Sequence, residues 1–580
     1  MRPHGFKLLL ALLLSASDLS ECLSGHHQRD VSPSPSGASA AAAAASPPSV
    51  RLSNGTYIGV RNDQYAQDFF LGIPYAQPPV GPLRYAPPQP LDESFDEPRS
   101  AAEYGRMCIG YGSDTASLGS PVSEDCLTIN IVRPAGTKPG DNLPVGLWVH
   151  GGSYVNGGSL DPRYNLSYIV QQSVRENKPI IAASINYRLS YWGFLFSQEL
   201  QDGKAGNLGF RDQRLALRWL RDNIAPFGGS PDKVTVWGES AGARSLGMQL
   251  IAYDGRHDGL FRSAILQSGS SVAKFVGAEA WQPFFDALLR KTSCDASGDA
   301  AARLACLRAL PWQTLNGIFN GSDPLGVTAP VITAVVDGDF ITAQASALLR
   351  QGKFAPVPLL LGNNFDEGTG YARQGVNTTE QFEAWVASSL QVDAAQVAAI
   401  SRLYPDDPAV GIPASHPGRP SGSLAAFGSQ WKRVAAVAGD YQQHSGRRLL
   451  ASSYARVGLP VYSYMWNVYV NGLGPIYGAT HFQEVVFVFN NVRALGYATN
   501  PFEGKPKSYF ELADLMSKMW VAFIHDTDPN QCNSPRLTWP RYTPRRPQNL
   551  VFDANYTRLG YVARDDYRAA EIAYMQEHVF

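Results

Sequence analysis

The sequence has almost no net charge and no long run of basic residues. Its 49 Lys and Arg are balanced by 50 Asp and Glu, which gives a formal net charge of −1 at pH 7. Binding to a phosphate backbone needs clustered Lys and Arg. We therefore expect no nucleic-acid partner.

Apolar runs of membrane-spanning length are also missing, as are motifs for metals and nucleotides. No segment is long enough to cross a bilayer, and the final residues, 575–580, do not form the apolar tail of a GPI signal. The chain has no His-Glu-x-x-His motif and no nucleotide-binding glycine loop. We therefore expect no transmembrane anchor, no metal and no organic cofactor.

Cysteine is scarce, with six among 580 residues, and its placement fits an oxidising compartment. Four of the cysteines form two near pairs that would each close a short loop: Cys108 with Cys126, and Cys294 with Cys306. Cys532 is left over if Cys22 is removed with an N-terminal signal.

The N-terminus has the features of a secretory signal peptide. Arg2 and Lys7 flank an apolar run at 8–14, and small residues follow at 15–17. We assign residues 1–20 to this signal, with cleavage between 16 and 24, and residues 21–48 to a low-complexity spacer. In a secreted chain the Asn-x-Ser/Thr sequons become candidate glycosylation sites. These sequons begin at Asn54, Asn165, Asn320, Asn377 and Asn555.

The remaining residues, 49–580, alternate apolar strands with helical stretches. Strand patterns cover 126–132, 143–149, 180–186, 234–237, 264–267, 357–362 and 461–466, and helical patterns cover 211–224 and 511–525. This alternation indicates an α/β fold with a large, mostly parallel central sheet and helices on both faces, which we take as a single domain. Residues 70–81 are rich in turn formers and are expected to lack regular structure.

The stretch 234–243 reads as a buried strand, a sharp turn at Gly238-Glu-Ser-Ala-Gly242, and the start of a helix. Gly-x-Ser-x-Gly is typical of a turn that lifts a nucleophilic serine, here Ser240, out of a sheet. The glycines allow strand and helix backbones to approach closely. The helix N-terminus behind the serine favours developing negative charge.

A serine nucleophile needs a base, and the base needs an orienting carboxylate. In a fold of this kind the acid and then the histidine follow the serine along the chain. Glu367 and its neighbour Asp366, just past an apolar strand, are the candidate acids. The candidate bases are His416, His444, His481 and His525, of which His481 is best placed, in a loop after the strand pattern 461–466.

Acyl transfer also needs backbone N–H donors for the oxyanion that develops on the substrate. Ala241, the residue after the serine, can supply one donor. The loop of Gly151, Gly152 and Ser153, which follows the strand pattern 143–149, can supply two more.

With these residues assembled, the chain resembles the type-B carboxylesterase/lipase family, which has the α/β-hydrolase fold and includes cholinesterases and fungal lipases. The resemblance runs from about residue 50 to the C-terminus. Besides the serine turn it is carried by Gly72-Ile-Pro-Tyr-Ala-Gln-Pro-Pro-Val-Gly81, Ser123-Glu-Asp-Cys-Leu-Thr-Ile-Asn130, Asn186-Tyr-Arg188, the segment 207–217, Phe227-Gly-Gly-Ser-Pro-Asp232 and Gln267-Ser-Gly269.

The resemblance implies a catalytic triad of Ser240, Glu367 and His481, because the family uses the glutamate of Asp-Glu-Gly. It implies an oxyanion hole made by the N–H groups of Gly152, Ser153 and Ala241. Many members have a third glycine where this chain has Ser153, and the added side chain narrows the pocket. The resemblance also implies the disulfides Cys108–Cys126 and Cys294–Cys306 and the structural ion pairs Arg84–Glu124 and Arg188–Asp212.

The loop between the first two cysteines bears on the substrate. In the family's lipases this loop is a long, apolar lid, whereas here it has 17 residues, is polar and contains no tryptophan. The sequence therefore predicts a secreted serine carboxylesterase that acts on small or soluble esters without a lid. A lipase or sterol esterase for long-chain lipid esters is the first alternative. A non-catalytic adhesion or binding protein on the same fold is the second, although such relatives typically lack a triad residue.

Overall fold

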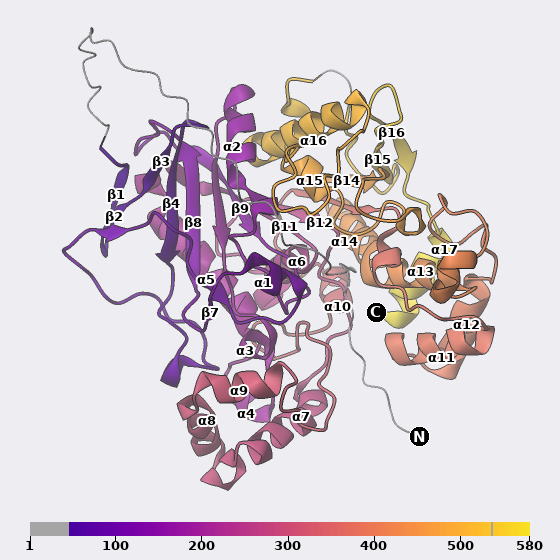
Figure 1. Cartoon of the computed structure of the whole chain (residues 1–580), viewed down its shortest axis with the longest axis horizontal. Helices are drawn as coiled ribbons and strands as arrows, with labels where there is room; N and C mark the ends of the chain where they lie inside the picture. The colour runs from indigo at the N-terminus through magenta and orange to yellow at the C-terminus, as the bar shows by residue number, and fades with distance from the viewer. Residues whose placement is uncertain (1–45, 535–536) are drawn as a thin grey trace, which may run out of the picture.

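The computed structural model describes residues 46–534 and 537–580 (Figure 1). The signal peptide expected at 1–20, and all but the last three residues of the spacer expected at 21–48, lie outside the described residues. The first strand, β1 (Ser49–Leu52), begins where that spacer was expected to end.

An 11-stranded sheet forms the centre of the molecule. In spatial order its strands are β16 (Gly560–Arg564), β15 (Gln548–Phe552), β14 (Val461–Trp466), β13 (Leu359–Asn364), β12 (Ser263–Gln267), β11 (Gly229–Glu239), β9 (Leu143–Val149), β10 (Ile181–Ile185), β8 (Thr128–Pro134), β4 (Gln67–Pro74) and β3 (Val60–Asn62). From β15 to β10 every neighbouring pair is parallel, and the strands outside this range are antiparallel. The expected mostly parallel sheet is confirmed.

Two small sheets accompany the large one. The first contains β1, β2 (Gly55–Ile58) and β5 (Arg99–Ser100), and the second contains β6 (Met107–Cys108) and β7 (Val122–Ser123).

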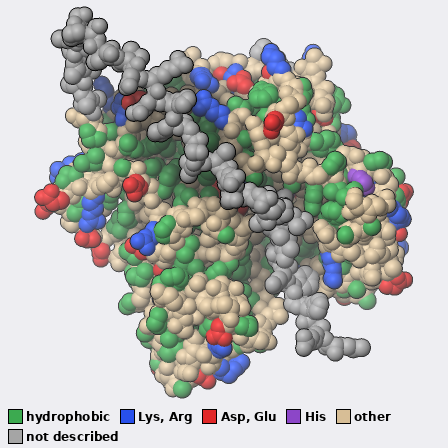
Figure 2. Space-filling view, in the orientation of Figure 1, with side chains coloured by type: hydrophobic (Ala, Val, Ile, Leu, Met, Phe, Trp, Pro, Cys, Tyr) green, Lys and Arg blue, Asp and Glu red, His purple; other side chains and the backbone are tan. Residues whose placement is uncertain are grey.

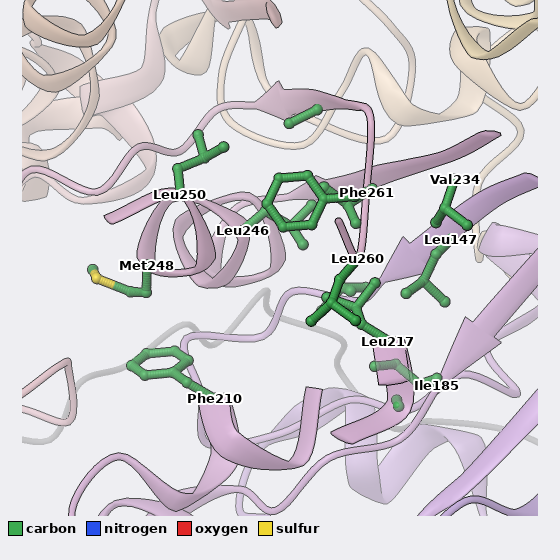
Figure 3. Close-up of a cluster of buried hydrophobic side chains, with 14 of the residues drawn as sticks. Leu147, Ile185, Phe210, Leu217, Val234, Leu246, Met248, Leu250, Leu260 and Phe261 are labelled. Atoms are coloured by element: carbon green, nitrogen blue, oxygen red, sulfur yellow. The ribbon is translucent and has the colours of Figure 1, made fainter. Parts of the chain in front are cut away.

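Side chains alternate across a strand, so neighbouring residues of the central strands pack into two different cores. Leu147 and Val149 of β9 join one core, while Trp148 between them joins the other. The first core is covered by α5 (Leu208–Asn223), α6 (Ala241–Gly255), α10 (Ala345–Arg350) and α14 (Ser445–Arg456), and Figure 3 shows its part around α5 and α6. The second is covered by α2 (Leu166–Arg175), α15 (Val485–Val488) and α16 (Lys507–Asp526). Helices therefore cover both faces of the sheet.

Two smaller apolar clusters lie outside these layers. One, at the bottom of Figure 1, joins α3 (Ser190–Phe194), α4 (Gln198–Asp202), α7 (Ala278–Lys291), α8 (Ala300–Ala309) and α9 (Trp312–Phe319). The other joins α11 (Thr379–Leu390), α12 (Ala394–Leu403), α13 (Trp431–Gly439) and the C-terminal turn η10 (Met575–Val579), beside α17 (Ala569–Tyr574).

One expectation about local structure is wrong. Residues 70–74, expected to lack regular structure, form the second half of β4, which pairs antiparallel with β8. The register of this pair shifts between Phe70 and Ile73. Within the shift Gly72 has φ +67°, and its N–H donates to Asn130 Oδ1 at 2.9 Å. The turn formers thus mark a bulge inside a strand.

Among the described residues, no helix is long and apolar enough to span a membrane. On the face shown in Figure 2, positively and negatively charged side chains of the described residues are interspersed.

Candidate active site

Ser240 lies in a sharp turn between β11 and α6, at the carboxyl end of β11. Its φ of 55° and ψ of −124° fall outside the regions that L-residues favour. A Cβ on Gly242 would lie 2.0 Å from the Val149 carbonyl oxygen, and a Cβ on Gly238 would lie 2.8 Å from the same atom. The Ser240 N–H donates to the Gln267 carbonyl at 2.9 Å. Backbone contacts therefore require both glycines and hold the serine in its strained conformation.

The structure brings Ser240, His481 and Glu367 together in one hydrogen-bonded row. His481 Nε2 lies 2.8 Å from Ser240 Oγ, and His481 Nδ1 lies 2.6 Å from Glu367 Oε2. The Glu367 side chain is fully buried, whereas 16% of the His481 side chain is exposed. If Nδ1–H donates to the carboxylate, Nε2 is free to accept the serine proton. The row has the geometry that proton transfer from the serine requires.

The two candidate acids make different contacts. Glu367, at the start of η5 (Glu367–Gly370), accepts the Asn364 N–H at its Oε1 at 2.8 Å and meets the histidine with its Oε2. Asp366 instead accepts the Ala479 N–H at 2.8 Å, and burial raises its pKa to about 6. Of the two candidate acids, Glu367 is therefore the one that is hydrogen-bonded to His481.

The other three candidate histidines lie in different surroundings. Their contacts are His444 with Asn363, His525 with Asp526, and the His416 carbonyl with Lys432 Nζ. Of the four candidates, His481 is the one hydrogen-bonded to the serine.

The loop after β9 passes directly against the nucleophile. A Cβ on Gly151 would lie 3.0 Å from Ser240 Cβ, so this position has no room for a side chain. The loop turns at Gly152 and Ser153, whose φ values are 102° and 55°. The Gly152 carbonyl is occupied by Asn156 Nδ2 at 3.1 Å. Ala241 opens α6, and a first-turn N–H has no acceptor within its own helix.

Two buried carboxyl groups beside the triad, Glu239 and Glu484, were not identified from the sequence. Glu239 Oε1 lies 3.3 Å from His481 Nε2. Glu484 accepts from Asn364 Nδ2 at 2.8 Å and from Gln267 Nε2 at 3.2 Å. Burial raises the pKa of both groups, and neighbouring carboxylates raise it further. Their only sequence signals are positional: Glu239 directly precedes the serine, and Glu484 follows His481 by three residues.

The structural links that the resemblance implied are present. Among the described cysteines, Cys108 is bonded to Cys126, Cys294 is bonded to Cys306, and Cys532 is a free thiol. The ion pairs Arg84–Glu124 and Arg188–Asp212 both form at 2.6 Å.

The sequons differ in their surroundings. Asn320, Asn377 and Asn555 are exposed, whereas Asn54 and Asn165 are partly buried. The Asn165 side chain caps α2 by accepting the Ser167 N–H at 3.0 Å. Within residues 46–534 and 537–580, no group of three His, Cys, Asp or Glu side chains is arranged to hold a metal.

Known proteins resemble this chain over almost its full length. The model of the carboxylesterase family matches residues 46–574. Lipase 4 of Diutina rugosa is 35% identical over 564 residues, which cover 91% of this chain and 95% of that protein. Secreted lipase 1 of Botryotinia fuckeliana is 32% identical over 86% of this chain and 88% of its own length.

A solved structure shares the architecture. Aspergillus niger EstA matches with a TM-score of 0.78 and 26% identity, covering 91% of this chain and 98% of its own. Together with the serine turn, the matches of sequence and structure show that the chain belongs to the carboxylesterase family, serine ester hydrolases on the α/β-hydrolase fold.

Proposed function

We propose that this chain is a secreted carboxylesterase that hydrolyses small, soluble esters through an acyl-enzyme on Ser240. The observation that carries the proposal is the hydrogen-bonded row of Ser240, His481 and Glu367. In the first half of the reaction His481 Nε2 takes the hydroxyl proton while Ser240 Oγ attacks the ester carbonyl. Glu367 accepts the Nδ1–H and stabilises the imidazolium.

The tetrahedral oxyanion is held by the N–H groups of Gly152, Ser153 and Ala241. His481 then protonates the leaving alcohol, and the acyl group remains on Ser240. A water molecule enters, loses a proton to His481 and attacks the acyl-enzyme, which releases the carboxylic acid and restores the serine. This cycle needs no metal and no organic cofactor.

The preference for small esters is supported by the loop between Cys108 and Cys126. Its helix, α1 (Ser113–Leu118), has six residues and none of them is buried. The loop is also tied to the segment 152–157: the Tyr111 N–H donates to the Val155 carbonyl at 2.5 Å, and the Gly157 N–H donates to Thr115 Oγ1 at 3.4 Å. A short, tethered loop with no apolar face offers little surface for adsorption to lipid.

A lipase is the second candidate function, and the relatives favour it. Lipase 4 of Diutina rugosa and the secreted triacylglycerol lipase LIP1 of Gibberella zeae, 31% identical over 90% of this chain, are both named for lipid substrates. In this case the tethered loop would have to move aside before a long-chain ester could enter.

Secretion is part of the same proposal. Residues 1–20 act as a signal peptide, 21–48 as a spacer and 49–580 as one catalytic domain. The names of secreted relatives and the two disulfides support this view. Exposed Asn320, Asn377 and Asn555 are then better glycosylation acceptors than Asn54 and Asn165. The mass and N-terminus of protein recovered from the culture medium test this part.

Hydrolysis of p-nitrophenyl esters of increasing acyl length, by the wild type and by Ser240→Ala, tests the proposed chemistry. We expect strong short-chain turnover that falls about 10⁶-fold in the variant, as follows removal of a triad serine in other enzymes. A peak at long chains, with a rise in activity on emulsions, would identify a lipase. A folded wild type without turnover on any chain length would contradict ester hydrolysis.

A further inference from the structure

We propose that Arg163 is a positioning residue that links the Cys108–Cys126 loop to the turn carrying His481. We call Arg163, together with its contacts to Asp114, Asp161 and Phe482, the clasp. Arg163 lies in η2 (Pro162–Tyr164), between the glycine loop and α2. Its guanidinium contacts Asp161 in its own turn and two segments that are distant in sequence, at Asp114 in the Cys108–Cys126 loop and at Phe482 next to His481. The inference rests on the proposed ester hydrolysis, because His481 is the base of that reaction.

Asp161 fixes the guanidinium in one orientation. Its Oδ2 accepts from Arg163 Nε at 2.9 Å and from Nη2 at 2.5 Å, while its Oδ1 accepts the Arg163 backbone N–H at 2.9 Å. Only 1% of the Asp161 side chain is exposed, so this bidentate pair is shielded from solvent. On the other side, a Cβ on Gly496 would lie 2.8 Å from Arg163 Cγ. Close packing and a buried partner thus hold the arginine.

The fixed guanidinium supports the residue after the catalytic histidine. Arg163 Cζ lies 4.9 Å from the centre of the Phe482 ring, within the range of a cation–π contact. Phe482 has φ +76°, a conformation that a bulky residue keeps only when its surroundings impose it. The Tyr164 ring packs edge-on to the same ring at 6.1 Å. The arginine therefore helps to hold a strained turn whose first residue must stay 2.8 Å from the serine.

The ion pair between Arg163 and Asp114 is weaker than the pair between Arg163 and Asp161, because Asp114 is partly exposed to solvent. Arg163 Nη2 meets Asp114 Oδ1 at 3.0 Å, and 30% of the Asp114 side chain is exposed. Solvent and salt screen such a pair more than they screen the buried Asp161 pair. The loop also packs closely against the segment that follows the glycine loop, since a Cβ on Gly112 would lie 2.8 Å from Asn156 Cγ. The Asp114 end of the clasp is consequently the one that can open while the Asp161 end stays closed.

The two ends of the clasp predict separable effects. Loss of the Asp114 contact frees the Cys108–Cys126 loop and changes access for bulky acyl groups, which appears in KM. Loss of the guanidinium also releases Phe482 and the His481 turn, which appears in kcat for every ester. If Arg163 only stabilised the fold, its replacement would change the melting temperature without separate effects on KM and kcat.

Four variants test the clasp: Arg163→Gln, Arg163→Lys, Asp114→Asn and the matched control Asp125→Asn. Asp125 is an exposed carboxylate of the same loop, and within the described chain its side chain forms no ion pair. The measurements are kcat and KM for a short and a long p-nitrophenyl ester at low and high NaCl, together with hydrogen–deuterium exchange of residues 109–125 and 481–489. The exchange readout does not depend on esterase activity, so failure of the clasp is distinguishable from failure of the proposed function.

We expect Arg163→Gln to lower kcat about tenfold on both esters, with faster exchange in both segments, because a small displacement of the base is costly. Arg163→Lys should restore part of kcat, since it keeps the charge but not the planar fork. Asp114→Asn should lower KM for the long ester about threefold at low salt and abolish the salt dependence of this KM, with faster exchange in 109–125 only.

A wild-type kcat in Arg163→Gln, or the same kinetics and exchange in Asp114→Asn as in Asp125→Asn, would overturn the proposal. If Arg163→Gln does not fold, Arg163→Lys and Asp114→Asn still decide it.

Discussion

The turn that carries Ser240 and the loop between Cys108 and Cys126 both pack against the segment 151–157, yet they are held in different ways. Backbone atoms hold the serine turn, where Gly242 approaches the Val149 carbonyl too closely for any side chain. The cysteine loop is mostly half-buried or exposed, and it is held by a disulfide, by the backbone hydrogen bond from Tyr111 to Val155 and by side chains such as Thr115. The serine turn is thus fixed by steric contacts that leave no room for a side chain, whereas the cysteine loop is held by contacts that can be altered one at a time.

After Ser240→Ala, the largest effect is expected from replacing Glu367, the acid of the hydrogen-bonded row that ends at the serine turn. Glu367→Gln keeps the shape of the side chain but cannot hold the imidazolium by charge, and its amide disturbs the histidine tautomer. We expect kcat to fall about 10⁴-fold, or about 5 kcal/mol of transition-state stabilisation, with little change in KM. Steady-state kinetics on a short p-nitrophenyl ester measure both constants.

Asp366→Asn is the matched control, because it changes the adjacent carboxyl in the same turn. Its contact is with the Ala479 N–H, which an asparagine oxygen can also accept. Its kcat should stay near that of the wild type. Equal losses in the two variants would show that the turn as a whole, and not the carboxylate on His481, carries the effect.

The next effect compares one glycine from each region. Gly242→Ala would place a Cβ 2.0 Å from the Val149 carbonyl oxygen, so we expect a loss of more than about 4 kcal/mol in the free energy of unfolding, or no folded protein. Gly119→Ala, in the cysteine loop, meets open space at φ +62° and should cost only about 1 kcal/mol. Urea unfolding measures both. Similar losses would remove the distinction between the two regions.

The centre of the fold and the serine turn could be predicted because they depend on local sequence. Strands β9 and β14 coincide with the patterns 143–149 and 461–466, since continuous apolar runs fit strands that are buried on both faces. The serine turn could be recognised because its glycines are required by contacts within a strand–turn–helix unit. The choice of Glu367 over Asp366 did not follow from spacing and depended on the resemblance.

The features that were missed depend on tertiary contacts. Strand β4 was not expected, because the bulge at Gly72 interrupts its alternation and leaves only turn formers visible. Glu239 and Glu484 are buried beside the histidine, although charged residues of this kind are usually exposed. Arg163 contacts Asp114, which lies 49 residues before it, and Phe482, which lies 319 residues after it. No local sequence pattern predicts contacts over such distances.

The smallest of the effects concerns the pH dependence of stability. Burial raises the pKa of Asp366 to about 6 from an ordinary value of 3.8, so between these two pH values the folded state holds more protons than the unfolded state. The stability that Asp366 contributes is therefore fully present below pH 3.8 and is lost as the pH rises through 6, on the order of 3 kcal/mol in total. Asp366→Asn stays neutral, so its stability relative to the wild type should grow from about zero near pH 4 to a plateau above pH 6. Urea unfolding from pH 4 to 7 measures this difference. Asp125→Asn, which removes an exposed carboxylate from the cysteine loop, should show little of it, and a difference for Asp366→Asn that does not change with pH would contradict the burial argument.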